Sequence, residues 1–228
     1  MNQYYTKRLS AERLEHCYEI APPRVKRYLD AEIDFVLERV GPEDLVLELG
    51  CGYGRVMNKL TQKARWVVGI DTSVNSLVYG RTCMPSASES SLVAMDAQQL
   101  GFRDHVFDVV VCIQNGISAF HVDQELLIRE SVRVAKTGGT LLFSSYSNKF
   151  WDHRLEWFRK QSKAGLMGDI DDAKTKDGVI TCKDGFTATT VGRDLFLALA
   201  SRVGVSAQVV EVDESSLFCE MVSGTSAL

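Results

Sequence analysis

Three glycines stand at alternate positions directly after a short apolar segment. Residues 46–49 read Val-Leu-Glu-Leu, which is typical of a buried strand, and Gly50, Gly52 and Gly54 follow beside the acidic Glu48. Because glycine has no Cβ, the backbone at these positions can turn sharply and approach a ligand closely. A helix is expected to begin just after the turn. This order of strand, acid, glycine loop and helix predicts a bound nucleoside.

Two other kinds of glycine loop fit this spacing poorly. A dinucleotide-binding loop requires a small residue where Arg55 stands, and a phosphate-binding P-loop ends in Gly-Lys-Ser/Thr, which is absent here. A tight connection from strand to helix, with no ligand, is the structural alternative.

An aspartate ends the next predicted strand. Residues 66–70 form a short apolar run, and Asp71 lies 21 positions after Gly50, about where the second strand of a β-α-β unit ends. Its carboxylate offers two acceptor oxygens to the vicinal 2′ and 3′ hydroxyls of a ribose, and each such bond contributes about 1.5–3 kcal/mol. Alternatively, Asp71 caps the following helix, for which Thr72 and Ser73 are also available.

The glycine loop also carries a family resemblance. Residues 48–54, Glu-Leu-Gly-Cys-Gly-Tyr-Gly, resemble the acidic-x-Gly-x-Gly-x-Gly signature of class I methyltransferases that use S-adenosylmethionine. The resemblance covers about residues 42–222 apart from an insertion, and it implies fold, cofactor and reaction type together. Residues 136–139 are similar to the family's Lys-Pro-Gly-Gly turn, with Thr137 in place of the proline.

A third acid completes the resemblance. In the family, the third strand ends in an acid, and Asp96 with Ala97 matches that position. The resemblance implies that Asp96 accepts a hydrogen bond from the adenine amine and that the Ala97 amide donates to a ring nitrogen. Taken alone, Asp96 is more often a loop acid than a ligand. The expected cofactor-binding residues are Glu48, Gly50, Cys51, Gly52, Gly54, Asp71, Thr72, Asp96, Ala97 and Gln114.

Strands and helices alternate along most of the chain. The pattern predicts strands at 45–49, 66–70, 92–95, 107–113 and 140–146, helices at 54–64, 73–83 and 122–135, and a helical segment at 10–40 before them. A helix at 191–203 and two strands at 207–212 and 217–222 close the chain. We therefore expect an α/β fold: a Rossmann-like, seven-stranded, mostly parallel sheet with an antiparallel C-terminal hairpin and helices on both faces.

Residues 147–190 interrupt this alternation. The segment holds Trp151 and Trp157 among basic residues, and an acidic run follows at 169–172. A connection of this length is usually functional, so we predict a lid that selects the acceptor. The alternative is a surface excursion that covers the sheet edge or forms a dimer contact.

Methyl transfer from a sulfonium is an in-line displacement, in which positioning contributes roughly 7–11 kcal/mol and acid–base help is optional. Open α/β sheets bind ligands at the carboxyl ends of their strands. The catalytic candidates near those ends are Asn115, His121, Tyr146, His153 and Arg154. Arg154 is expected to orient an anionic group on the acceptor, and His153 to accept a proton or to position the nucleophile. The alternatives are a turn for Asn115, a helix-cap region for His121, and a solvated helix face for the other pair.

Composition limits the classes of function. The chain has 228 residues, 45% of them apolar, with a formal charge of −4. We expect one methyltransferase domain over 1–228, with an N-terminal helical segment at 1–41 and the insertion at 147–190. The charge predicts no nucleic-acid partner, and no apolar run approaches the roughly 20 residues that span a membrane. No residues have metal-ligand spacing, and no secretory signal is apparent, which predicts a cytoplasmic protein. A homodimer is possible.

The sequence therefore predicts an S-adenosylmethionine-dependent methyltransferase that acts on a small-molecule acceptor through an N, O, S or C nucleophile. Two alternatives remain. A nucleoside-binding regulator without catalysis would share every feature except a productive acceptor pocket. An NAD-dependent oxidoreductase would share the strand, glycine loop and second acid, but the glycine spacing and the C-terminal hairpin oppose it.

Overall fold

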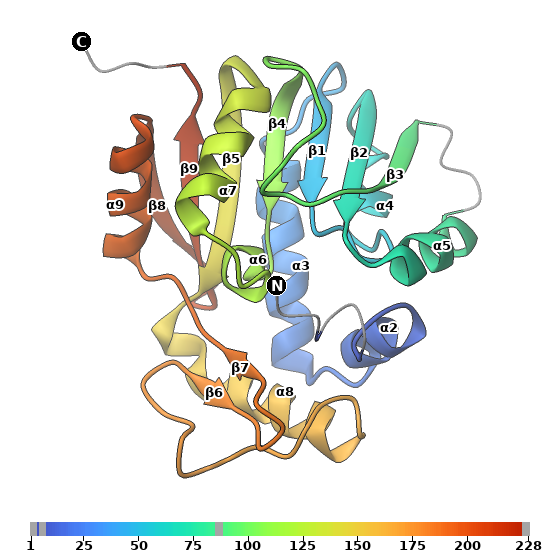
Figure 1. Ribbon diagram of the computed structural model, residues 1–228, viewed down its shortest axis with the longest axis vertical. Helices are drawn as coiled ribbons and strands as arrows, with labels where there is room; N and C mark the ends of the chain where they lie inside the picture. Colours follow the sequence, from blue (N-terminus) through green and yellow to red (C-terminus); the bar gives the residue numbers. More distant parts are fainter. Residues whose placement is uncertain (1–3, 5–7, 85–88, 225–228) are drawn as a thin grey trace.

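The computed structural model describes residue 4 and residues 8–84 and 89–224. Its central element is a seven-stranded sheet of order β3-β2-β1-β4-β5-β9-β8 (Figure 1). In chain order the strands are β1 (Leu45–Leu49), β2 (Trp66–Asp71), β3 (Ser90–Ala94), β4 (Phe107–Cys112), β5 (Ala135–Tyr146), β8 (Ser206–Val212) and β9 (Ser216–Val222). The first five pair in parallel, and β9 pairs antiparallel with β5 and β8. The predicted mostly parallel sheet with an antiparallel C-terminal hairpin is confirmed.

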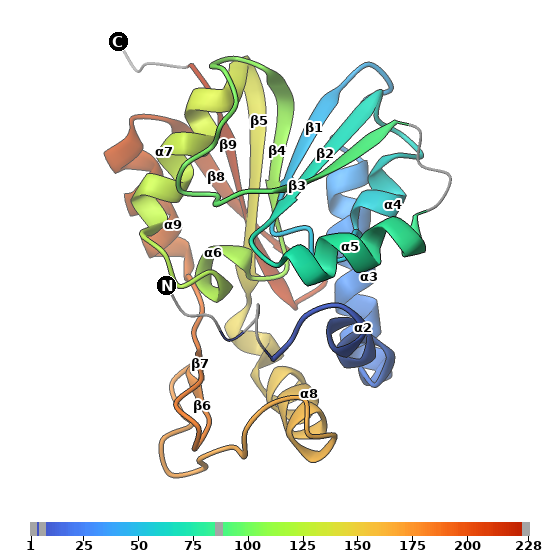
Figure 2. The same ribbon diagram turned by 45° about the vertical axis from the view of Figure 1, so that its right-hand side comes forward.

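Helices cover both faces of this sheet (Figure 2). On one face lie α3 (Pro23–Leu37), α4 (Met57–Leu60) and α5 (Val74–Cys83). On the other lie α6 (Gly116–Ala119), α7 (Gln124–Val134) and α9 (Arg193–Val203). Each face buries its own cluster of apolar side chains against the sheet.

Strand β4 shows how the sequence builds both layers. Its side chains alternate, so that Val110 and Cys112 join the cluster under α7 and α9, while Val109 and Val111 join the cluster under α3 and α4. All four are buried. A strand covered on both faces reads as a continuous apolar run, which explains why the sequence pattern revealed it. Full burial of one valine side chain contributes about 1.5–3 kcal/mol.

Two predicted helices have different boundaries in the structure. The helix expected at 54–64 is reduced to α4, with turns on either side of it. The segment expected at 10–40 divides into α2 (Glu12–Glu19) and α3, which begins at Pro23. Proline has no N–H group and is accepted in the first turn of a helix, so Pro22 and Pro23 separate the two helices. Of the predicted N-terminal segment, residues 1–3 and 5–7 lie outside the described residues.

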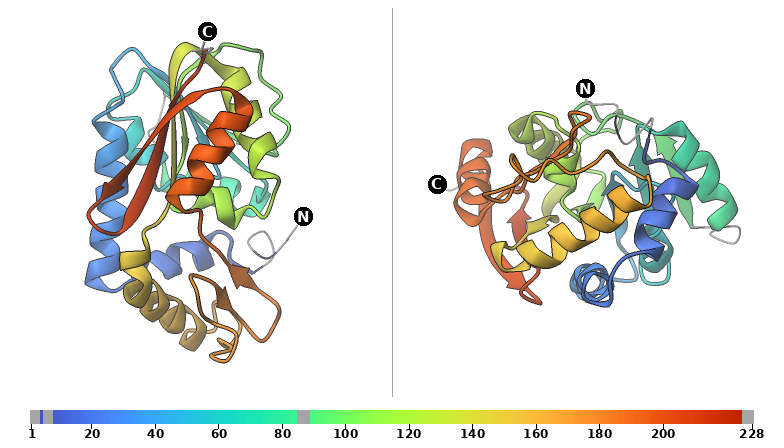
Figure 3. Two further views of the ribbon diagram at one scale, coloured as in Figure 1. Left: turned by 90° about the vertical axis from the view of Figure 1, so that its left-hand side faces the viewer. Right: turned by 90° about the horizontal axis from the view of Figure 1, so that it is seen from below.

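The remaining elements gather at the carboxyl ends of the parallel strands. They are α2, the short helix η1 (Asn148–Phe150), α8 (Trp151–Lys163), and the hairpin β6 (Ile180–Thr181) and β7 (Thr187–Ala188). Figure 1 shows them below the sheet, and Figure 3 shows from below that α2 (dark blue) and α8 (gold) extend across its edge. Trp157 on α8 joins the two helices by donating its Nε1–H to the carbonyl of Cys17, at 2.9 Å. None of the described helices is long and apolar enough to cross a membrane.

Candidate functional site

A cavity of about 540 Å³ lies at the carboxyl ends of β1, β2 and β4. Nine of the ten predicted cofactor-binding residues line it: Glu48, Gly50, Cys51, Gly52, Asp71, Thr72, Asp96, Ala97 and Gln114. Gly54 does not; it turns the chain behind the loop, where a Cβ would lie 2.4 Å from the Met84 side chain. The structure thus brings together residues that the sequence spreads over more than sixty positions.

The glycine loop fits closely against its surroundings. Gly52 has a φ of +56°, and a Cβ there would lie 2.9 Å from Leu14 on α2. The backbone N–H groups of Gly50 and Cys51 donate to the Ile70 carbonyl at 2.8 and 2.9 Å, which holds the loop against the end of β2. A side chain at Gly52 would therefore meet both an unfavourable backbone conformation and a steric clash.

Asp71 ties the loop to the next helix. Its Oδ2 accepts the Gly52 N–H at 2.9 Å, and its Oδ1 accepts the Ser73 N–H at 2.7 Å. Burial raises the pKa of this carboxyl, although these hydrogen bonds act against the shift. A carboxylate oxygen can accept more than one hydrogen bond, so both oxygens of Asp71, which lines the cavity, retain acceptor capacity. The helix-cap role falls to Ser73, whose Oγ accepts the Ser76 N–H.

Glu48 and Arg55, an acid and a base in the cavity wall, each have buried polar atoms without hydrogen-bond partners among the described residues. Glu48 is buried, and its Oε2 has no partner among the described residues. The same is true of Nε and Nη2 of Arg55, whose guanidinium lies 4.5 Å from the centre of the Tyr18 ring. Burial raises the pKa of Glu48 to about 8, against the lowering effect of Arg55. An unpaired carboxyl and an unpaired guanidinium in one cavity are the complement of a zwitterion.

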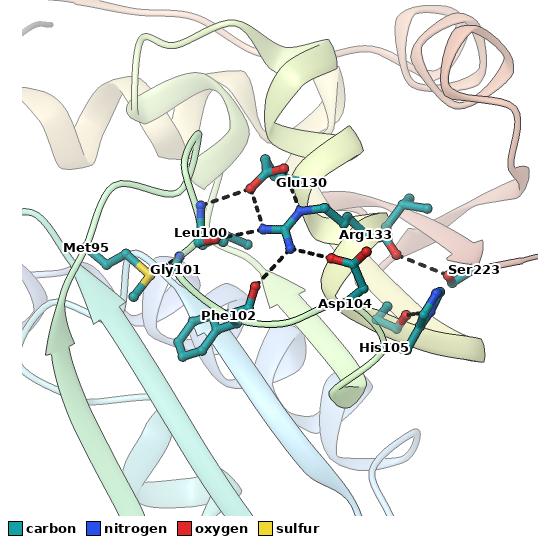
Figure 4. A network of polar contacts seen from close by, with 11 residues as sticks. Met95, Leu100, Gly101, Phe102, Asp104, His105, Glu130, Arg133 and Ser223 are labelled. Atoms are coloured by element: carbon teal, nitrogen blue, oxygen red, sulfur yellow. Dashed lines mark hydrogen bonds and ion pairs between the residues drawn. The ribbon is translucent and has the colours of Figure 1, made fainter.

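Asp96, the third acid, lies in a loop that hydrogen bonds from α7 hold in place. Asp96 Oδ1 accepts the Gln98 N–H at 2.9 Å. Figure 4 shows the anchor of this loop, in which Arg133 on α7 donates to the carbonyls of Leu100 and Phe102 at 2.7 and 2.9 Å. Arg133 also pairs with Glu130, whose carboxylate accepts the Leu100 N–H. This network fixes the segment that follows Asp96, and thereby the edge of the cavity.

The rest of the cavity wall is mainly apolar and aromatic. Helix α2 supplies Leu14, Cys17 and Tyr18, while α8 supplies Trp157, Phe158 and Gln161. Leu9, Phe120, Tyr146 and Met167 complete this side. Among the described residues, no three His, Cys, Asp or Glu side chains are grouped so that they could hold a metal ion.

Comparison with known proteins agrees with this geometry. Residues 47–143, which include the glycine loop, Asp71 and Asp96, match the family model of a methyltransferase domain. A demethylmenaquinone methyltransferase of Mycobacterium bovis is 37% identical over 109 residues, which are 48% of this chain and 44% of the relative. A 2-methyl-6-phytyl-1,4-hydroquinone methyltransferase of Synechocystis is 28% identical over 137 residues, 56% of this chain and 42% of the relative. The chain thus spans less than half the length of the curated relatives it matches.

Solved structures share the fold. A protein of Pyrococcus horikoshii has a TM-score of 0.67 at 18% identity, covering 98% of this chain and 99% of its own. The N-methyltransferase NodS of Bradyrhizobium japonicum, solved with S-adenosyl-L-homocysteine, has a TM-score of 0.59 at 16% identity and covers 88% of each chain. Residues 47–143 therefore match a methyltransferase-domain family, and the chain shares the fold of these solved structures. Its glycine loop and its antiparallel β9 have the positions that the resemblance implied.

The structure does not bring every predicted catalytic residue to this cavity. Tyr146 lines it, whereas Asn115, His121, His153 and Arg154 do not. The side chain of His153 lies on the exposed face of α8, with its ring beside Phe150. Neither His153 nor Arg154, which were expected to face the reaction site, is among the residues that line this cavity.

Arg154 has a structural role instead. It is only 1% exposed and donates to the carbonyls of Gly178 and Ala188 at 2.8 and 2.9 Å. Its guanidinium lies 4.6 Å from the centre of the Tyr146 ring. Arg154 thus connects α8, β5 and the hairpin segment. The solvated-face alternative holds for His153 and fails for Arg154.

Asn115 and His121 also support the surrounding structure. Asn115 adopts a left-handed conformation at the end of β4, with a φ of +62°. Its amide nitrogen donates to the Thr189 carbonyl at 3.0 Å, and its Oδ1 accepts the Ser145 hydroxyl at 2.7 Å. The turn interpretation of Asn115 thus agrees with the structure. The ring of His121 packs edge-on against Phe186, and burial lowers its pKa, which favours the neutral form.

Helical periodicity could have identified the residues on α8 that line the cavity. Arg154, Trp157, Phe158 and Gln161 recur at steps of three and four residues and form the buried face of the helix. Residues 152, 153, 156, 159 and 160 form its exposed face. The sequence analysis predicted a catalytic role for the polar pair His153 and Arg154, whereas the apolar Trp157 and Phe158 line the cavity. The sequence analysis did not predict Arg55 as a binding residue. The one feature that could have indicated it is its position as a cation directly after the glycine loop.

Proposed function

We propose that this chain binds S-adenosylmethionine and transfers its methyl group to a small, largely apolar acceptor molecule. The observation that carries the proposal is the arrangement of three complementary polar sites in one cavity. Glu48 and Arg55 suit the ammonium and carboxylate of an amino-acid end, and Asp71 suits the ribose hydroxyls. Asp96 and Ala97 suit the edge of adenine.

The residues present fit this cofactor on structural grounds. Glu48 Oε2 and Arg55 Nε are buried polar atoms that the described residues leave unpaired, and each would gain a charged partner. Gly52 leaves room at the point where a Cβ would clash. When bound, the cofactor supplies an electrophilic methyl group on a sulfonium. The protein's own contribution is to position the acceptor and exclude water, because α2 and α8 close the apolar side of the cavity.

The cavity wall and the names of the relatives support an aromatic acceptor in this proposal. Trp157, Phe158, Phe120 and Met167 offer a surface for a flat apolar ring rather than for a strongly charged group. Both curated relatives are named for methyl transfer to a quinone or hydroquinone. A small aromatic acceptor therefore replaces the anionic acceptor that Arg154 suggested, since Arg154 is engaged elsewhere.

The insertion at 147–190 forms the acceptor side of the site in this proposal. It supplies Trp157, Phe158, Gln161 and Met167 to the cavity wall. A role in selecting the acceptor, the extent of the single domain, a cytoplasmic location and a homodimer all stay predictions.

Transfer is tested with the purified chain and S-adenosylmethionine that carries a deuterated methyl group. The protein is incubated with a panel of small aromatic acceptors that includes naphthalene-1,4-diol, and products are identified by mass spectrometry. The proposal predicts a labelled product that forms only with protein present, together with S-adenosylhomocysteine in equal amount. A chain that binds the cofactor but forms no labelled product from any acceptor would support the nucleoside-binding regulator instead.

A further inference from the structure

A buried acid lies near the cavity but is not among the residues that line it. Glu32 on α3 is fully buried between that helix and the sheet. Its Oε2 accepts the backbone N–H of Gln114 at 2.7 Å, while Oε1 has no partner in hydrogen-bond geometry within the described part of the chain. Burying a carboxyl among apolar groups is unfavourable, so its presence suggests a function.

Tyr28 connects this acid to the cavity. Tyr28 and Glu32 are four residues apart on α3, so they occupy the same helix face, and both are fully buried. The Tyr28 ring centre lies 5.2 Å from that of Tyr146, which lines the cavity at the end of β5. The hydroxyls of Tyr28 and Tyr146 influence each other's pKa, and Glu32 raises both pKa values. Tyr28 thus adjoins Tyr146 and shares a helix face with Glu32, and the Tyr28 hydroxyl and Glu32 Oε1 are both buried without a hydrogen-bond partner in the described part of the chain.

We propose that Tyr146, Tyr28 and Glu32 form a proton relay that removes the proton of a hydroxyl-bearing aromatic acceptor during methyl transfer. This inference rests on the proposed function and specifies its substrate class. In the step, the acceptor's oxygen or ring carbon forms a bond to the methyl carbon, the carbon–sulfur bond breaks, and sulfur keeps the electron pair. The acceptor's proton passes to Tyr146, that of Tyr146 to Tyr28, and that of Tyr28 to Glu32. The tyrosines end neutral and Glu32 ends protonated.

The surroundings of Glu32 suit a base that acts near neutral pH. Burial raises its pKa to about 7, although the Ser144 and Ser216 hydroxyls and the Gln114 N–H act to lower it. Arg55 is the positive group that lowers it further, and Tyr28, Tyr146 and Cys112 are the other titratable groups that interact with it. A base works best when its pKa is close to the working pH. Glu32 must be ionised in order to accept the proton, so activity should rise as the pH increases through about 7.

A structural role for Glu32 is the alternative. Its hydrogen bond holds the backbone at Gln114, which has a φ of +56°. Glu32→Gln separates the two roles, because the amide oxygen still accepts that N–H but cannot take up a proton. Tyr146→Phe removes the hydroxyl at the cavity and keeps the ring. Asp34→Asn, an exposed acid on the same helix, is the matched control.

The test compares two acceptors with each variant over pH 5.5–9, a range that brackets the pKa of about 7. Naphthalene-1,4-diol must lose a proton from a weak acid, whereas naphthalene-2-thiol ionises readily without a base. With the diol, Glu32→Gln should lower kcat at least about tenfold and abolish the rise through pH 7, with KM changed less than about threefold. Tyr146→Phe should lower kcat similarly. The double variant of Glu32→Gln and Tyr146→Phe should have a kcat no lower than that of the slower single variant, because either substitution alone already interrupts the same relay. Turnover of the thiol should change little.

An activity-independent readout accompanies the kinetics. Difference infrared titration should show a carboxyl band that disappears near pH 7 in the wild type, is missing in Glu32→Gln, and shifts in Tyr28→Phe. Unchanged kcat and pH profile in Glu32→Gln would overturn the relay. The relay would also be overturned if the wild type methylated only the thiol. It would likewise be overturned if the wild type bound S-adenosylhomocysteine but methylated neither the diol nor the thiol. A chain that binds no adenosyl compound would instead refute the proposed function.

Discussion

Arg55 projects from the glycine loop into the cavity with hydrogen-bonding capacity that the protein does not use. Its Nε and Nη2 have no hydrogen-bond partners in the described structure, and its guanidinium lies 4.5 Å from the centre of the Tyr18 ring. A guanidinium placed this way can form two parallel bonds to a carboxylate. The amino-acid end of the cofactor supplies such a group, and the adenosine part does not.

Replacing Arg55 should therefore weaken ligands selectively. In Arg55→Met, we expect affinity for S-adenosylhomocysteine to fall at least about tenfold, equivalent to about 1.4 kcal/mol. Affinity for 5′-methylthioadenosine, which lacks the amino-acid end, should change less than about twofold. Isothermal titration calorimetry measures both, with Lys59→Met, an exposed cation on α4, as the control. Equal losses for the two ligands would show that Arg55 shapes the cavity rather than recognising the carboxylate.

The sequence predicted the individual residues of the cofactor side, because the patterns that identify them lie close together in the chain. The glycine spacing, the acid at 48 and Asp71 lie within two strands and the connections after them. Glu32 and Tyr28 gave no such signal, because they resemble ordinary positions of an amphipathic helix until the fold brings Tyr146 beside them. The functional meaning of such residues depends on long-range packing that a motif cannot encode.

At the scale of elements, α8 determines how the insertion contributes to the site. Its buried face presents Trp157, Phe158 and Gln161 to the cavity and Arg154 to the hairpin segment. The length of 147–190 indicated an insertion, but polarity alone could not say which side of the helix faces inward. The boundaries of α4 were also mispredicted, since turns adjoin the glycine loop where helical spacing had suggested a longer helix.

The structural role of Arg154 makes a clear prediction. Arg154→Met keeps much of the side-chain length but leaves the carbonyls of Gly178 and Ala188 without this donor, so the free energy of unfolding should fall by about 2–4 kcal/mol. Denaturant unfolding monitored by circular dichroism measures this loss. Arg159→Met, on the exposed face of α8, should change the value by less than about 0.5 kcal/mol. Full stability combined with lost turnover in Arg154→Met would restore the catalytic role that the sequence suggested.

For the whole molecule, the fold places two different surfaces around one cavity. Residues at and after the ends of the parallel strands supply the polar groups of the cofactor side, and α2 and α8 supply much of the apolar side. The N-terminal segment and the insertion also contact each other directly, through Arg13 donating to the Gly165 carbonyl and Arg8 pairing with Asp184. Alternating strands and helices predicted the sheet, whereas contacts between segments more than 150 residues apart could not be inferred from one sequence.

The most direct test of this account is calorimetry of S-adenosylhomocysteine binding to the wild type and to Asp71→Ala. We predict one binding site per chain, and a loss of about 1.5–3 kcal/mol in Asp71→Ala, because the ribose hydroxyls would lose a charged acceptor. Asp30→Ala, an exposed acid on α3, should bind as the wild type does, and circular dichroism checks that each variant is folded. No binding by the wild type, or equal affinity in a folded Asp71→Ala, would contradict the assignment of this cavity to the cofactor.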